Sequence, residues 1–124
     1  PYMPKEFEVY IKDIMECTEK IEKYTKGVSY GEFVKNDLVI DGVVRNLEII
    51  GEAVKRIPIE IKKQHPDIEW KKIAGLRDIL IHEYSGVNVK IIWDIVINKI
   101  PALKNAINGI IENCKGDKDG DSDG

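Results

Sequence analysis

Hydrophobic residues recur along this chain at steps of three and four, the spacing that places them on one face of an α-helix. The first such stripe predicts a helix over residues 5–25 and consists of Phe7, Tyr10, Ile11, Ile14, Cys17, Thr18, Ile21 and Tyr24. Gly27 follows, and glycine commonly ends a helix. Residues 28–35 are expected to form a connector with a short helical turn around Glu32.

A second helix is predicted to begin after Asn36, whose side chain can cap it, and to run to about Arg56. Its apolar face consists of Ile40, Val43, Val44, Leu47, Ile50, Val54 and Ile57. Gly42 and Gly51 lie within it, and each lowers helix propensity by roughly 1 kcal/mol. We expect another backbone to approach this helix closely at the two glycines.

Two helical segments are predicted to follow. Pro58 suits the first turn of a short helix, which ends before Pro66. A longer helix is expected over about 68–84, with Asp67 as its cap.

The last predicted helix starts after Asn88 and continues to Cys114. Its apolar positions alternate steps of four and three, a spacing typical of antiparallel helix bundles. Pro101 lies inside this helix, where it removes one hydrogen bond and is expected to kink it. Together the segments predict an all-α fold, an antiparallel bundle of four to five helices.

The chain has 124 residues, of which 43% are hydrophobic and 33% are charged, as in an ordinary globular domain. Residues 1–114 are expected to form one helical domain, and residues 115–124 an acidic low-complexity tail. The tail matches only the first half of a calcium-binding loop, so we expect no calcium site there.

The chain lacks an apolar run long enough to span a membrane, and its first six residues lack the apolar core of a signal peptide, so we expect neither feature. Cys17 and Cys114 lie far apart, outside any metal-binding pattern, and there are two histidines. We therefore expect a cytoplasmic protein without disulfides, metal or cofactor.

Charge is unevenly distributed in this chain of net charge −3. Residues 55–77 contain seven Lys or Arg and three Asp or Glu, a net charge of +4. A basic segment in an acidic protein is what local phosphate binding requires. The alternative interpretation is a solvated lysine face.

The residues best suited to chemistry are Arg77, Asp78, His82 and Tyr84. Asp78 and His82 are four residues apart and share a helix face, so the carboxylate can orient the imidazole. Arg77 and His82 differ by five residues, or about 140° of rotation, so a straight helix does not point both at one atom. They can converge if the helix unwinds towards Gly86, or if a second copy of the chain supplies the partner group.

An arginine and a histidine together suit RNA cleavage. Histidine can accept and return a proton near neutral pH, and arginine can bind a phosphate and stabilise developing charge. The nucleophile is the ribose 2′-hydroxyl of the substrate, so the enzyme needs no serine or cysteine. The structural alternative is a histidine that satisfies helix-end carbonyls beside an arginine paired with a carboxylate.

The sequence resembles the HEPN superfamily, and within it the HepT-like toxins of prokaryotic toxin–antitoxin pairs. The motif is Arg, four residues, His, one residue, Tyr, which Arg77, His82 and Tyr84 match, with Asp78 as the polar residue after the arginine. Residues 45–53, residues 70–78 and the segment from Trp93 to Leu103 also resemble the family, in order.

This resemblance implies a homodimeric helical bundle that cleaves RNA without metal. It implies that Arg77 and His82 of both copies line a cleft between them, and that an MntA-type nucleotidyltransferase antitoxin silences the enzyme by transferring AMP to Tyr84. The competing function class is a non-enzymatic helical module that binds nucleotide or assists a separate nucleotidyltransferase. For Tyr84, the alternative is a packed side chain whose hydroxyl is bonded to a carbonyl.

Other polar residues are expected to have structural roles. Asn46 is expected to form a buried hydrogen bond. Glu48 and Glu52 are expected to be solvated or paired with Arg45 or Lys55. The two cysteines are interpreted as small apolar residues, and the second histidine, His65, is expected to be exposed and without function.

Overall fold

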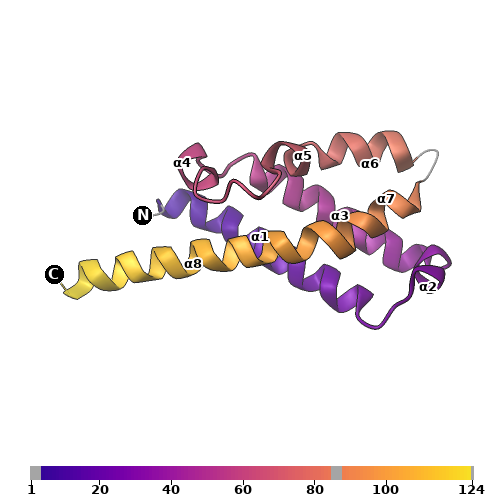
Figure 1. Cartoon of the computed structure of the whole chain (residues 1–124), viewed down its shortest axis with the longest axis horizontal. Helices are drawn as coiled ribbons and strands as arrows, with labels where there is room; N and C mark the ends of the chain where they lie inside the picture. Colours follow the sequence, from indigo (N-terminus) through magenta and orange to yellow (C-terminus); the bar gives the residue numbers. More distant parts are fainter. Residues whose placement is uncertain (1–3, 85–87, 124) are drawn as a thin grey trace.

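The computed structural model describes residues 4–84 and 88–123, without the side chains of residues 81–84 and 115–123. Four helices, α1 (Lys5–Thr25), α3 (Asp37–Val54), α6 (Leu76–Tyr84) and α8 (Ile100–Asp123), run in alternating directions along the molecule (Figure 1). Shorter elements connect them: α2 (Tyr30–Val34), α4 (Ile59–Lys62), α5 (Trp70–Ala74), α7 (Val89–Asp94) and a π-helical segment, η1 (Ile95–Lys99). The part of the chain in view contains no strand, so the prediction of an all-α bundle is confirmed. None of its helices is both long and apolar enough to cross a lipid bilayer.

The first connector follows the sequence prediction. α1 has the predicted bounds, and Gly27 adopts a left-handed backbone with φ of 71° just after it. Ser29 then starts α2 with reciprocal bonds: its hydroxyl accepts from the Glu32 N–H, and the Glu32 carboxylate accepts from the Ser29 N–H. Asn36 caps α3 as predicted, because its Oδ1 accepts from the Val39 N–H at 3.2 Å.

Helix α3 is the centre of the bundle and contacts α1, α2, α5 and α6. The predicted stripes of α1, α3 and α8 supply most of the side chains that solvent cannot reach: Phe33, Ile14, Ile21, Leu47, Ile50, Leu103, Ile107, Val43, Val54 and Thr18. Asn46 is also buried, and its Nδ2 donates to the Gly42 carbonyl at 2.8 Å. The predicted buried hydrogen bond of Asn46 is therefore confirmed.

Several helix boundaries differ from the prediction. α3 ends at Val54 and not near Arg56, because the Arg56 and Ile57 N–H groups form three-residue turns before Pro58, which disfavours a helical conformation in front of it. The helix expected over 68–84 is divided into α5 and α6 at Gly75, a poor helix former.

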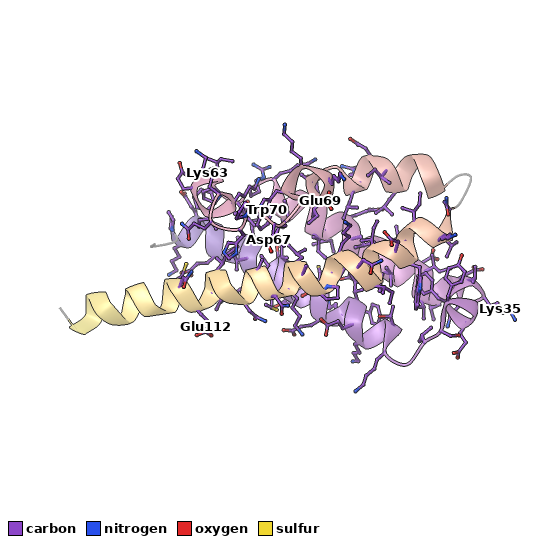
Figure 2. All side chains as sticks on the ribbon, in the orientation of Figure 1. Lys35, Lys63, Asp67, Glu69, Trp70 and Glu112 are labelled. Atoms are coloured by element: carbon purple, nitrogen blue, oxygen red, sulfur yellow. The ribbon has the colours of Figure 1, made fainter. Side chains whose placement is uncertain are left out.

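The predicted cap Asp67 is also wrong. The residue at the start of α5 is Glu69, and its side chain does not cap the helix. Its carboxylate instead accepts from Lys72 and from Lys99, each at 2.6 Å, and so joins α5 to the π-helical segment η1. Figure 2 shows Glu69 near Trp70, the first residue of α5.

The last helix continues through Pro101, as its apolar spacing predicts, but the ladder widens before the proline. The Ile100 N–H donates to the Ile95 carbonyl, a step of five residues. Pro101 has no N–H and cannot donate to the carbonyl four residues before it. The wide π-helical turn lies where the regular pattern of α-helical hydrogen bonds would therefore be interrupted. Asn88 precedes α7 as predicted, although its side chain forms no capping bond. The backbone of α8 stays helical to Asp123, beyond the stripe that ends at Cys114 (Figure 1).

The two glycines of α3 have different neighbours. A Cβ atom on Gly51 would lie 3.1 Å from the Ile73 carbonyl oxygen, so the backbone of α5 approaches α3 here, as expected. A Cβ atom on Gly42 would instead meet the Tyr24 ring at 3.2 Å. The neighbour of Gly42 is thus a side chain and not a backbone, because the Tyr24 ring covers this turn of α3.

We predict that Gly51→Ala destabilises the fold. The added methyl group meets a carbonyl of a packed helix, and overpacking of this kind costs about 1–3 kcal/mol. The gain in helix propensity, roughly 1 kcal/mol, does not offset this. Urea unfolding followed by circular dichroism should show a lower midpoint.

The matched control is Gly42→Ala, where the neighbouring Tyr24 ring is 38% exposed and can move. This variant should be as stable as the parent or more stable by up to about 1 kcal/mol. Equal losses in the two variants would contradict the assignment of Gly51 as the point of close backbone approach.

We also predict a pH dependence at Glu69. Hydrogen bonds and ion pairs with Lys72 and Lys99 lower the pKa of Glu69 to about 2, from an ordinary value of 4.5. A carboxylate with a lowered pKa stabilises the folded state above pH 4.5, and this contribution is lost as the pH falls towards 2. Melting temperatures measured from pH 6 to pH 2 should therefore fall more for the parent than for Glu69→Gln.

Glu112→Gln is the control for this comparison, because Glu112 is exposed and has no ion pair among the side chains that the structure describes. Its pH profile should parallel that of the parent. If the Glu69→Gln profile does so as well, the contacts between Glu69 and the two lysines contribute nothing to stability.

Candidate functional site

Helix α6 holds all four residues that the sequence singles out. Arg77 and Asp78 lie in its first turn, and both side chains are exposed. The α6 backbone places residue 82 one turn after Asp78 and ends at residue 84. The side chains of His82 and Tyr84 lie outside the described residues, as do Ser85 and Gly86, where the helix was expected to end.

Arg77 is held beside α3. Its Nη1 lies 3.8 Å from Oε1 of Glu52, and about half of each side chain is exposed. The close contact at Gly51, one residue before Glu52, brings the α5–α6 segment against α3 and thereby places Arg77 there. The two motifs that the sequence suggested separately, in residues 45–53 and 70–78, are therefore in contact.

An open groove of about 380 Å³ lies along α3 between α1 and α6, a volume within the range of small ligand sites. We call it the arginine groove, and its lining residues are Tyr10, Asp13, Arg45, Glu48, Ile49, Glu52, Ala53, Arg56 and Arg77. A larger and mainly apolar pocket of about 710 Å³ lies between α1 and the η1–α8 junction. Neither Arg77 nor Asp78 lines that larger pocket, so the arginine groove is the candidate site.

Sequence reasoning missed two residues of this groove. Arg45 was considered only as a partner of Glu48 or Glu52, and Arg56 was not singled out. Arg45 on α3 and Arg56 just after the end of α3 line the groove together with Arg77. The scarcity of arginine in the sequence could have drawn attention to these two residues. The chain has only three arginines among its nineteen basic residues, and all three line this groove.

The acidic residues of α3 partly follow the prediction. Glu52 accepts from Lys55 at 3.2 Å, which is one of the expected pairs, and it also faces Arg77, which was not foreseen. Glu48 is half-buried in the wall of the groove. The groove thus contains three guanidinium groups and three carboxylates, those of Asp13, Glu48 and Glu52.

Residues outside the groove include one correction. His65 was expected to be exposed, but it is half-buried, its Cε1 faces Gly109 of α8, and its Nε2 is buried without a hydrogen-bond partner. The packing of the α4–α5 connector causes this, because the Trp70 indole donates to the carbonyls of His65 and Lys62 (Figure 2). Burial raises the pKa of the Cys17 thiol to about 11, so Cys17 is a neutral core residue as expected. The residues in view contain no cluster of three or more possible metal ligands.

Comparison with known proteins identifies the family of this chain. A family model described as HepT-like ribonuclease matches residues 14–110, which include α3, α6 and every arginine of the groove. A candidate RNase of Caldanaerobacter subterraneus subsp. tengcongensis is 43% identical over 106 residues, which cover 86% of this chain and 95% of the relative. No solved structure gives a significant match.

Two archaeal relatives are similarly close. A candidate RNase of Methanocaldococcus jannaschii is 42% identical over 116 residues, which cover 93% of this chain and 96% of that protein. A protein of Thermococcus cleftensis named as a probable ribonuclease HepT is 42% identical over 102 residues, 82% of this chain and 93% of its own. The match extends over nearly the whole bundle, and on this evidence the chain belongs to the HepT-like ribonuclease family.

Proposed function

We propose that this chain is the ribonuclease toxin of a prokaryotic toxin–antitoxin pair, and that it cleaves RNA without metal at a cleft between two copies of the chain. Family membership makes the chain a ribonuclease and RNA its substrate. The observation that carries the site assignment is the exposed Arg77, which lies at the start of α6 and lines the arginine groove.

The proposed reaction is an internal transfer within the RNA. The 2′-oxygen forms a bond to the adjacent phosphorus while the bond from phosphorus to the 5′-oxygen of the next nucleotide breaks. The products are a 2′,3′-cyclic phosphate and a free 5′-hydroxyl. His82 accepts the proton of the 2′-hydroxyl, and an imidazolium returns a proton to the leaving 5′-oxygen. Arg77 stabilises the charge that develops on the phosphate oxygens.

The geometry of α6 supports the proposed dimer. Arg77 and His82 are separated by about 140° around the helix, so one straight helix cannot direct both at one phosphate. The α6 backbone remains helical as far as Tyr84, so unwinding before His82 does not resolve the problem. A second copy does, because Arg77 of one copy can then meet His82 of the other. Asp78, one turn before His82, is suited to orient its imidazole.

We assign to Tyr84 a regulatory role. A tyrosine ordinarily titrates near pH 10 and is a poor general base at neutral pH. Its position two residues after His82, in the last turn of α6, suits an acceptor for AMP from a nucleotidyltransferase antitoxin of the MntA type. An attached AMP carries a phosphate that can bind Arg77 and occupy the space of the RNA phosphate.

We predict that the protein cleaves single-stranded RNA in the presence of EDTA and leaves a cyclic phosphate end. His82→Ala should lower the rate by roughly 10²–10⁴-fold, because a general acid–base group is lost. The rate should be measured with labelled RNA, with mass spectrometry of the product ends.

The same samples provide the controls. The variant should keep the helical circular dichroism spectrum of the parent and sediment with it as a dimer. Unchanged cleavage by His82→Ala would overturn the assignment of His82. A strict requirement for magnesium would overturn the metal-free mechanism, and a parent that is monomeric and active would overturn the shared cleft.

We predict that co-expression with a cognate nucleotidyltransferase increases the mass of the intact chain by whole AMP units. The increase should be absent from Tyr84→Phe, which lacks the acceptor hydroxyl but keeps the ring. The modified parent should no longer cleave RNA, whereas Tyr84→Phe should remain active after co-expression.

The two readouts separate modification from simple occlusion. If Tyr84→Phe is silenced as fully as the parent, the antitoxin acts by covering the site, and the role assigned to Tyr84 is wrong. A catalytically inactive nucleotidyltransferase serves as the control for binding alone.

A further inference from the structure

The lysines and the arginines of this chain differ in where they lie. Its sixteen lysines are scattered along the whole sequence, whereas its three arginines, Arg45, Arg56 and Arg77, line one groove. Arginine binds phosphate oxygens through two parallel hydrogen bonds, which a lysine cannot do. Their concentration in one place indicates a ligand with more than one phosphate.

Arg45 lies on α3, and Arg56 lies two residues after the end of this helix at Val54. The nine residues from Arg45 to Val54 alone span about 14 Å along the helix axis. Arg77 of α6 lies beside Glu52, between these two positions along α3. At roughly 3.4 Å per stacked nucleotide, this length accommodates about four nucleotides of a single strand.

The two outer arginines are available to a ligand. Both side chains are exposed, and neither has an ion pair within the part of the chain whose side chains are described. Glu52 is engaged by Lys55 and Arg77. The carboxylates in the groove therefore do not hold Arg45 or Arg56 directly.

The opposite wall of the groove is suited to a nucleobase. Tyr10 of α1 is half-buried there, near Ile49 of α3. Grooves that bind single-stranded nucleic acid combine cations that follow the backbone with aromatic side chains on which bases stack. Asp13, on the same wall, can accept from an exocyclic amino group of a base.

We propose that the single-stranded RNA on either side of the cleaved phosphate lies in the arginine groove, with flanking phosphates on Arg45 and Arg56 and a base against Tyr10. This rests on the proposed function in one respect, namely that the phosphate at Arg77 is the one that reacts. Arg45 and Arg56 are binding residues and take no part in the chemistry. The groove contains three guanidinium groups and three carboxylates, so its net charge attracts polyanions only weakly. A strand must therefore bind by contacting the guanidinium groups directly.

The test measures binding separately from cleavage. The probe is a short, fluorescently labelled single strand of RNA in which every 2′-hydroxyl is methylated, so that it cannot react. Arg45→Gln and Arg56→Gln should each raise the Kd of this probe by roughly three- to tenfold. Each should also reduce the slope of log Kd against log salt by about 0.7, the loss of one phosphate contact to a single strand.

Arg45→Lys and Arg56→Lys should restore the salt slope and only part of the affinity, because the charge returns without the paired hydrogen bonds. Lys35→Gln is the matched control: it removes the same charge from an exposed side chain at the far end of the molecule, and the Kd should not change (Figure 2). With unmodified RNA, Arg45→Gln and Arg56→Gln should raise KM and leave kcat unchanged.

Three outcomes would overturn the proposal. The first is equal binding by the parent, Arg45→Gln and Arg56→Gln, and the second is no binding by the parent at low salt. The third is a loss of binding that follows dissociation of the dimer in sedimentation, which would make the groove a contact between copies of the chain. Failure of the proposed function looks different: the parent would bind the probe through its arginines and leave unmodified RNA uncut.

Discussion

The candidate site depends on the close packing of α3 against α5 and α6 at Gly51. A Cβ atom at this position would lie 3.1 Å from the Ile73 carbonyl oxygen, so glycine allows the two backbones to lie this close without a shift. The next residue, Glu52, then faces Arg77 across the junction. One face of α3 is buried in the core. The adjoining face lines a groove to which α1 and α6 also contribute residues. One backbone contact in the bundle thus determines where Arg77 lies in the groove.

An acidic chain can contain an anion site because charge is organised locally. The net charge is −3, yet all three arginines line one groove, while outside this groove the Glu69 carboxylate pairs with two lysines. Each of these ion pairs contributes little to stability, because it is exposed. Their main effect is to determine which cations remain unpaired and can bind a ligand. Lys72 and Lys99 are held by Glu69, whereas Arg45 and Arg56 are not held by any carboxylate among the described side chains.

The sequence predicted those features that repeat locally and missed those that depend on two segments meeting. The stripes of α1 and α3, the cap at Asn36, the bond of Asn46 and the close approach at Gly51 all follow from residue spacing and side-chain chemistry. The break at Gly75 and the wide turn at η1 do not, because periodicity continues through both. His65 was judged by its polar neighbours in sequence, whereas the packed α4–α5 connector holds it against Gly109 of α8. Arg45 and Arg56 were overlooked because only the packed bundle shows that they share a groove with Arg77.

The geometry of α6 has a consequence for control of the proposed activity. A helix that carries Arg77 and His82 five residues apart cannot complete a site by itself, so cleavage in the proposed mechanism requires two copies. If both proposals hold, a single chain binds an RNA strand in its groove without cutting it, and the rate depends on the concentration of the dimer. Tyr84 is in the last turn of the same helix. In the proposed mechanism, one modification there would therefore affect a site to which both copies contribute and would leave the core that holds Arg77 unchanged.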